Sequence, residues 1–315
     1  MSQIWSPSRL TRLTRLTRLS SIVFNGLLFF QSALIVTGGA VRLTGSGLGC
    51  PTWPQCTGDS IKPIAHQAQG QLHAWIEFGN RLVAWIIFIL AILAIFIVIK
   101  KFRERRDFKR LRALAVLQLL GFVGQVVLGG ITVLTKLNPI TVSAHFLLTI
   151  PLIAGALSLR NRIYQKPTTS ISKKTTSALN AVLLLTILVL FVGTLVTGTG
   201  PHAGDIQAKR YHFGERNISF IHGGIVLILI AAILYLLIMI RTNEPKEVTN
   251  SFGQRALIFL FIALAQGAIG YIQYLTKLPE VLVAAHLVGA TLIWVSAWGL
   301  YINADKADKK EFRKI

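Results

Sequence analysis

Four side chains that can carry chemistry stand within otherwise apolar stretches of the sequence: Glu77, His145, His222 and His286. An imidazole nitrogen can bind a metal ion, and a carboxylate can accept or release a proton. Glu77 is the only acidic residue in the interior of an apolar run, where a charge is costly and often functional. Plainer interpretations exist, since a lone histidine often serves packing and Glu77 can pair with Arg81, four residues on.

The apolar runs around these residues are long enough to cross a membrane. Of the 315 residues, 53% are hydrophobic and only 14% are charged, whereas an ordinary soluble domain is about 25% charged. A helix that rises about 1.5 Å per residue needs about 20 residues to cross the hydrocarbon layer. The sequence therefore predicts an all-α membrane protein. Its eight transmembrane helices are expected over 22–41, 72–99, 113–134, 139–159, 178–198, 217–240, 255–275 and 280–302.

Basic residues predict the orientation of these helices. The net charge of +21 would suit a nucleic-acid-binding protein, but the charges lie between the apolar runs instead of on one folded face. Lys and Arg accumulate on the cytoplasmic side of a membrane. One side of the expected topology carries 25 of them and the other side seven. We therefore expect a multi-pass protein of the cell membrane, with both termini in the cytoplasm and no nucleic-acid partner.

An internal repeat divides the chain into two related halves. LTKLNPITVSAH, residues 134–145, recurs as LTKLPEVLVAAH, residues 275–286, with seven of twelve positions identical. Duplications are common in membrane proteins, and the repeat interface often holds the site. The sequence thus predicts two related four-helix bundles. The expected segments are a basic cytoplasmic arm 1–21, an N-terminal half 22–160, a cytoplasmic linker 161–177, a C-terminal half 178–302 and a cytoplasmic tail 303–315.

The expected topology places the four titratable residues in one layer. The second, fourth, sixth and eighth helices start on the outer side, and the four residues lie five or six positions past those starts, roughly 8 to 9 Å below the surface. Imidazoles on facing helices of a bundle can hold a heme iron from both sides. A proton pathway would continue through the membrane, and zinc would gather its ligands around one point. Heme binding is therefore the leading interpretation.

The two cysteines, Cys50 and Cys56, both lie in the first outer loop. The expected topology places this loop in an oxidising compartment, where disulfides persist. The five residues between the cysteines include two prolines, so a ring closed here would be small and stiff. We expect a disulfide, with two free thiols or a redox-active pair as the alternatives.

Six motifs taken together resemble one known family. They are VTGGAVRLTGSGLGCPTWPQC in the first loop, IEFGNR on the second helix, SAH on the fourth, TGTGPHAGD after the fifth, IHGG on the sixth and AAH on the eighth. Each motif is weak alone, but the set is specific. With the motifs in this order and a four-plus-four duplication, the chain resembles heme A synthase over nearly its whole length.

The resemblance implies an oxidoreductase of aerobic respiration that supplies cytochrome oxidase with heme A. Such an enzyme oxidises a ring methyl of heme O to a formyl group by successive hydroxylations, with the oxygen coming from water. The implied partners are heme O, the enzyme that produces heme O, and the lipid bilayer. A homo-oligomer is compatible with the resemblance.

The resemblance also implies roles for individual residues. The C-terminal half would hold heme b, its iron bound axially by His222 and His286. The N-terminal half would bind the iron of the substrate heme through His145. Glu77 corresponds to an essential glutamate, which would accept a proton or stabilise positive charge on the oxidised carbon. Arg81 would neutralise a heme propionate, and the cysteine pair would form a disulfide near the substrate pocket.

Two departures from the family pattern concern possible ligands. Many relatives carry a histidine where this chain has Asn80, which could coordinate iron weakly, bond a water on the iron or leave the position open. His73 lies seven residues back, about 10 Å along the helix, so it would serve only a shifted heme. Some relatives have a second cysteine pair between the fifth and sixth helices. This chain has none there, and its His202 and Asp205 could make turns or cover a ligand.

Two other functions fit part of this pattern. A diheme cytochrome that only transfers electrons would need the histidines but not Glu77, and it would favour paired ligands in both halves. A heme-handling transporter or chaperone would need the repeat. It would, however, carry its polar residues near the middle of the membrane and not near one face.

Overall fold

Eight long helices make up most of the fold in the computed structural model, which describes the backbone of residues 7–306 and the side chains of residues 18–305. All eight contain a stretch long and apolar enough to cross a membrane, so the prediction of an all-α, multi-pass membrane protein is confirmed. The helices are α1 (Pro7–Leu43), α2 (Gln71–Lys101), α3 (Phe108–Leu134), α4 (Pro139–Ile163), α5 (Lys173–Thr199), α6 (Glu215–Asn243), α7 (Lys246–Leu275) and α8 (Glu280–Asn303).

The helices are longer than the predicted apolar spans because several of them continue into basic segments. α2 ends with Lys100 and Lys101, and α4 has Arg160 and Arg162 in its last turn. Cations at a helix C-terminus interact favourably with the helix dipole, and their long side chains reach the headgroup region. Each predicted span therefore lies inside one observed helix.

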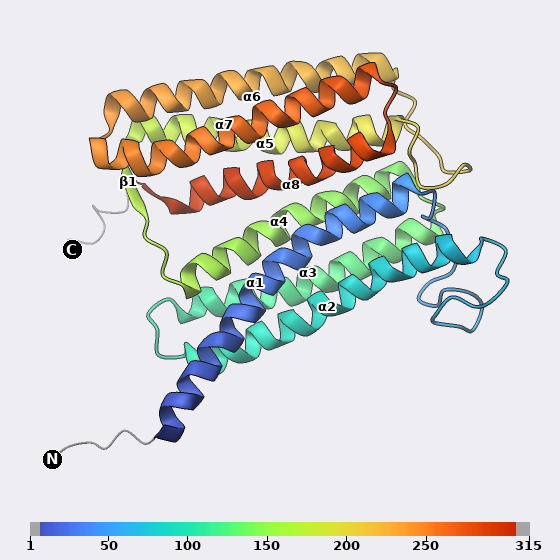
Figure 1. Ribbon diagram of the computed structural model, residues 1–315, viewed down its shortest axis with the longest axis horizontal. Coiled ribbons are helices and arrows are strands. Elements are labelled where there is room, and N and C mark those ends of the chain that lie inside the picture. Colours follow the sequence, from blue (N-terminus) through green and yellow to red (C-terminus); the bar gives the residue numbers. More distant parts are fainter. Residues whose placement is uncertain (1–6, 307–315) are drawn as a thin grey trace.

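The helices form two groups that lie side by side (Figure 1). Within α1–α4 each helix contacts the next, and α1 also contacts α4; α5–α8 are arranged in the same way. The groups meet where α1 and α4 contact α8 and where α4 contacts α5. Ile35 of α1 and Ile153 of α4 belong to the same buried cluster as Trp294 of α8. Side chains on α1 can therefore contact residues of both groups.

One end of the molecule carries the α1–α2, α3–α4, α5–α6 and α7–α8 connections, and we call it the loop end. α1 begins and α8 ends at the opposite end (Figure 1). The α3–α4 and α7–α8 turns each contain a Lys–Leu pair with positive φ: 52° and 58° at Lys136 and Leu137, and 62° and 59° at Lys277 and Leu278. The internal repeat thus has the same local backbone in both copies, and it starts α4 and α8 alike.

Two short strands connect distant parts of the chain. β1 (Thr169–Ile171), between α4 and α5, pairs in parallel with β2 (Ala304–Lys306), directly after α8. The sequence predicts a linker and a tail here and no strand, because the partners are 135 positions apart. At the other terminus, α1 begins within the expected basic arm 1–21. Residues 1–6 of that arm and residues 307–315 of the tail lie outside the described part of the chain.

Candidate functional site

Four helices each place one titratable residue near the loop end. α2, α4, α6 and α8 all begin there, and Glu77, His145 and His286 lie six residues after the first residue of their helices. His222 lies seven residues after the start of α6. At about 1.5 Å per residue, these depths differ by less than half a turn. We call the set of these four residues the histidine layer.

Each histidine of the layer lies against a glycine of a neighbouring helix. A Cβ atom on Gly129 of α3 would be 3.3 Å from Cε1 of His145, and one on Gly270 of α7 would be 3.0 Å from Cε1 of His286. These two glycines are repeat partners, 141 positions apart. Likewise, a Cβ atom on Gly193 of α5 would be 3.3 Å from Cε1 of His222 on α6. A larger residue in place of any of these glycines would therefore reduce the space available to the imidazole beside it.

The three imidazoles differ in their hydrogen bonds. Nδ1 of His222 and Nδ1 of His286 are buried and have no hydrogen-bond partner in the described part of the chain. These two rings are close enough to interact electrostatically. In contrast, the amide nitrogen of Gln125 lies 2.8 Å from Nδ1 of His145 once the amide is oriented to satisfy its neighbours. A buried polar atom without a partner calls for an explanation, and a bound group would supply one.

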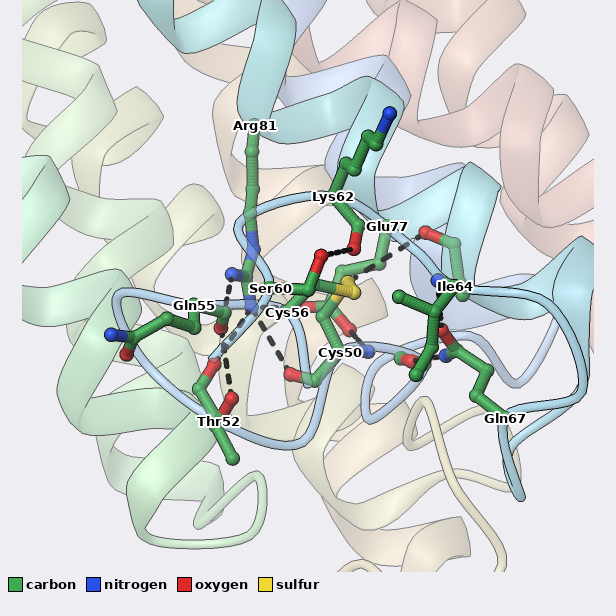
Figure 2. Close-up of a disulfide and its surroundings, with 12 residues drawn as sticks. Cys50, Thr52, Gln55, Cys56, Ser60, Lys62, Ile64, Gln67, Glu77 and Arg81 are labelled. Atoms are coloured by element: carbon green, nitrogen blue, oxygen red, sulfur yellow. Dashed lines mark hydrogen bonds and ion pairs between the residues drawn. A yellow bond between two sulfur atoms is a disulfide. The ribbon is translucent and has the colours of Figure 1, made fainter. Parts of the chain in front are cut away.

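Glu77 is buried, with 5% of its surface exposed, and both of its oxygens accept hydrogen bonds. Oε1 accepts from Nη2 of Arg81 at 2.7 Å, and Oε2 accepts from the backbone N–H of Cys50 at 2.7 Å. The i to i+4 ion pair expected from the sequence is therefore present. It lies between α2 and the α1–α2 loop (Figure 2).

Arg81 organises that loop. Its two terminal nitrogens also donate to four backbone carbonyls, those of Cys50, Thr52, Pro54 and Gln55. The ring of Trp53 lies 4.9 Å from the guanidinium, which is a cation–π distance. The predicted disulfide between Cys50 and Cys56 is present in the same loop (Figure 2). The loop is thus fixed to α2 through Glu77 and Arg81.

Asn80 and His73, the two alternative ligands of the first half, have partners within the protein. Oδ1 of Asn80 accepts a hydrogen bond from Oγ1 of Thr37 on α1 at 2.7 Å. Nδ1 of His73 lies 3.0 Å from Oγ of Ser46 in the α1–α2 loop. The structure therefore places Asn80 against α1 and His73 against the loop.

Arg42, at the end of α1, joins the two groups of helices. Its Nη2 donates to the carbonyls of Thr197 at 3.0 Å and of His202 at 2.6 Å, and its Nε donates to His202 at 3.2 Å. The ring Nε2 of His202 is in turn 2.8 Å from the carbonyl oxygen of Leu278, in the turn before α8. Arg42 stands inside the VTGGAVRLTGSGLGCPTWPQC motif, which is the one signal in the sequence that could have identified it as a site residue.

The α5–α6 loop folds back over the first half. The hydroxyl of Tyr211 is 3.2 Å from Oγ of Ser143 on α4, and the backbone N–H of Gly47 donates to the carbonyl of Gly204 at 2.8 Å. Asp205 accepts from the backbone of its own loop, at Gln207. The α5–α6 loop, which contains His202, is thus bonded to the α1–α2 loop and to the α7–α8 turn.

The chain is similar in sequence to proteins of one known family. The sequence profile of a family described as cytochrome oxidase assembly protein matches residues 22–204. A relative from Geobacillus thermodenitrificans, named heme A synthase, is 28% identical over 149 residues, which cover 46% of this chain and 44% of the relative.

Two further relatives carry the same name. One from Geobacillus kaustophilus is 34% identical over 64 residues, covering 20% of this chain and 18% of the relative. One from Azorhizobium caulinodans is 22% identical over 328 aligned positions, covering 88% and 91%. The chain thus matches less than half the length of the two Geobacillus relatives. Because the profile covers more than half of the chain, the chain belongs to the family of cytochrome oxidase assembly proteins in which these heme A synthases are found.

Proposed function

We propose that this protein is a heme A synthase, an oxidoreductase that converts a ring methyl of heme O to a formyl group by successive hydroxylations. The observation that carries the proposal is the histidine layer: three imidazoles and one buried carboxylate at one level near the loop end, in a chain of this family. The proposed setting is the cell membrane, with the loop end outside and both termini in the cytoplasm. The proposed partner is the enzyme that produces heme O.

The second half fits a resident heme b. His222 and His286 each have a buried nitrogen without a hydrogen-bond partner among the described residues, and glycines leave room for both rings. No group of three or more His, Cys, Asp or Glu side chains suited to a metal ion occurs among the described residues. A metal bound in this layer would therefore have to bring most of its ligands with it, as a porphyrin does. His222 and His286 would hold the heme iron, which supplies one-electron oxidation and reduction.

The first half fits the substrate. His145 occupies the position that His286 occupies in the second half, and it would hold heme O by its iron. Only one histidine of the layer belongs to this half, and the resemblance implies a second one at the position where this chain has Asn80. Asn80 is hydrogen-bonded to Thr37. The site in the first half would therefore offer one histidine to the heme iron, whereas the site in the second half would offer two. A substrate has to be released after the reaction, which a single strong ligand permits more readily than two.

Glu77 would act on the methyl group being oxidised. Its two hydrogen bonds fix the carboxylate in position before substrate binds, which is the arrangement that makes electrostatic stabilisation effective. A fixed negative charge would stabilise positive charge that develops on the methyl carbon, and a free lone pair would accept the proton. Both terminal nitrogens of Arg81 already donate to four carbonyls and to Glu77. We therefore assign Arg81 to holding the carboxylate and the loop.

The test is to express the chain in cells that make heme O but not heme A, and to identify the extracted hemes by mass and by pyridine spectrum. Heme A should appear with the wild-type chain and not with Glu77→Ala, while the variant still binds heme. Unchanged heme O with a well-expressed wild-type chain would overturn the proposal. A protein that binds two hemes and leaves heme O unchanged would be the diheme cytochrome. One that only raises heme O transfer to a partner would be the chaperone.

A further inference from the structure

Arg81 and Arg42, both near the loop end, each donate to more than one backbone carbonyl, but of these two only Arg81 has a counter-ion among the described residues. Arg81 donates to four carbonyls and also forms an ion pair with Glu77 at 2.7 Å. Arg42 donates to the carbonyls of Thr197 and His202, and it forms no ion pair in the described part of the chain. Its Nη1 makes none of these bonds. Arg42 therefore keeps an uncompensated charge and a nitrogen available to donate.

Two more cations accompany Arg42. Lys209 and Arg210 belong to the α5–α6 loop, whose N-terminal turn Arg42 holds, and Nη1 of Arg210 donates to the carbonyl of Gly200 in that turn. Arg42 and Arg210 are close enough to repel each other electrostatically. Neither Lys209 nor Arg210 forms an ion pair among the described residues. Three positive charges at this end of the molecule repel one another, and a bound anion would offset that repulsion.

A cleft lies where two of these cations, Arg42 and Lys209, meet the two groups of helices. Its walls are formed by Arg42 and Lys209 together with small and apolar residues: Leu137, Pro139, Val142, Gly198 and Ala203. Its free volume is about 10 Å³, which is close to the space that one water molecule needs. The cleft is thus suited to the polar end of a ligand and not to a whole ring.

The cleft lies about one helical turn beyond the histidine layer. Val142 is three residues before His145 on α4, on the side of the loop end. Gly39, three residues before Arg42 on α1, packs against the side chain of Leu287, which is next to His286 on α8. A flat ring bound through its centre in the layer would have its rim and its substituents near this level. Only a substituent with negative charge would be stabilised there.

We propose that Arg42, Lys209 and Arg210 form a binding site for an anionic oxygen group, and that the occupant is a propionate carboxylate of the porphyrin. Guanidinium and ammonium groups recognise carboxylates through charge-assisted hydrogen bonds. The site takes one donor from α1 of the first group and two from the loop of the second, so binding draws the two groups together. This inference rests on the proposed function, because it takes the ligand to be a heme. The phosphate of an anionic lipid offers the same chemistry, and the experiment separates the two sources.

The experiment compares two probes that differ only at the carboxylates, ferric protoporphyrin IX and its dimethyl ester. Full-length protein made under heme limitation is placed in bilayer discs of phosphatidylcholine and titrated with each probe. The variants are Arg42→Gln and the double variant Lys209→Gln/Arg210→Gln. Lys62→Gln is the matched control, because it removes an exposed charge from the α1–α2 loop at the same end of the molecule. The double variant keeps the test valid if Arg42→Gln does not fold, since its side chains lie in a surface loop.

Wild-type protein should bind the free acid about tenfold more tightly than the ester, as expected for one charge-assisted contact. The cation variants should lose this preference and bind the ester as wild type does, while Lys62→Gln keeps it. Equal wild-type affinity for both probes would overturn the proposal. So would a preference that survives in the variants while, in discs that also contain phosphatidylglycerol, they bind less of that lipid than wild type does, which would assign the site to lipid. If the preference is lost as expected but heme O is never converted, the site stands and the proposed function fails.

Discussion

The backbone N–H of Cys50 donates to Oε2 of Glu77 at 2.7 Å, so the disulfide loop is bonded directly to the one buried carboxylate of the described residues. The other oxygen of Glu77 is held by Arg81, which also binds four carbonyls of the same loop. The position of the carboxylate therefore depends on the fold of the loop and on the disulfide within it. Changes to any of them should affect the others.

Glu77→Gln separates the charge of the carboxylate from its shape. The amide still accepts from Cys50, but it leaves the guanidinium of Arg81 largely buried without a counter-ion, which should lower stability by about 3 kcal/mol. Glu77→Gln/Arg81→Met removes both charges, but it should recover only part of that stability, because four loop carbonyls lose the guanidinium that donates to them. If Glu77 has a chemical role, the double variant still makes no heme A. Heme A formation in the stable double variant would show that the pair serves only the fold.

Replacing Cys50 and Cys56 by serine should loosen the loop while leaving its sequence nearly unchanged. Loss of a native disulfide typically lowers stability by about 2–4 kcal/mol. We expect a lower unfolding temperature and less heme A, because the N–H that holds Glu77 is then less well placed. The spectrum of the heme in the second half should not change, because Cys50 is bonded to Glu77 and Arg81, which both lie on α2. Wild-type protein treated with a reductant should behave like the serine variant, and full activity of both would contradict the coupling.

Substitutions of the histidines should have different effects in the two halves of the molecule. His222→Ala and His286→Ala should each abolish the low-spin heme spectrum of the purified protein, because either change removes one of two axial ligands. His145→Ala should keep that spectrum and lose heme A formation. His212→Ala, in the exposed part of the α5–α6 loop, is the control and should change neither. A low-spin spectrum retained in both His222→Ala and His286→Ala would place the cofactor elsewhere.

Sequence reasoning succeeded where structure depends on neighbours along the chain. The apolar runs predict all eight helices because crossing a membrane requires a fixed length of apolar residues. The four residues fall at one level because depth in a helix follows from counting from its start. The spacing of Glu77 and Arg81 predicts their ion pair for the same reason.

Contacts between segments far apart in the chain could not be obtained in this way. Arg42 and His202 are 160 positions apart, and nothing local to either one indicates the other. The hydrogen bond between Thr37 and Asn80 joins α1 to α2, and no pattern in either helix fixes which side chains meet. The four carbonyls around Arg81 depend on the path of a loop that helical periodicity does not describe. These contacts decide how the candidate site is assembled, so the sequence predicts its members better than its geometry.

Gly270→Ala tests whether the space beside the histidines serves the cofactor. The added Cβ would be 3.0 Å from Cε1 of His286, closer than most van der Waals contacts, so the imidazole must shift. We expect weaker heme binding and a changed electron paramagnetic resonance spectrum, both of which respond to the orientation of the axial ligand. Gly267→Ala, one turn earlier on α7, adds the same atom at 3.9 Å from Val226 and is the matched control. Alanine favours a helix by about 1 kcal/mol over glycine, so both variants should gain the same intrinsic helix stability. Only the change at Gly270 should disturb the heme, and identical spectra for the two variants would mean that the glycine serves helix packing alone.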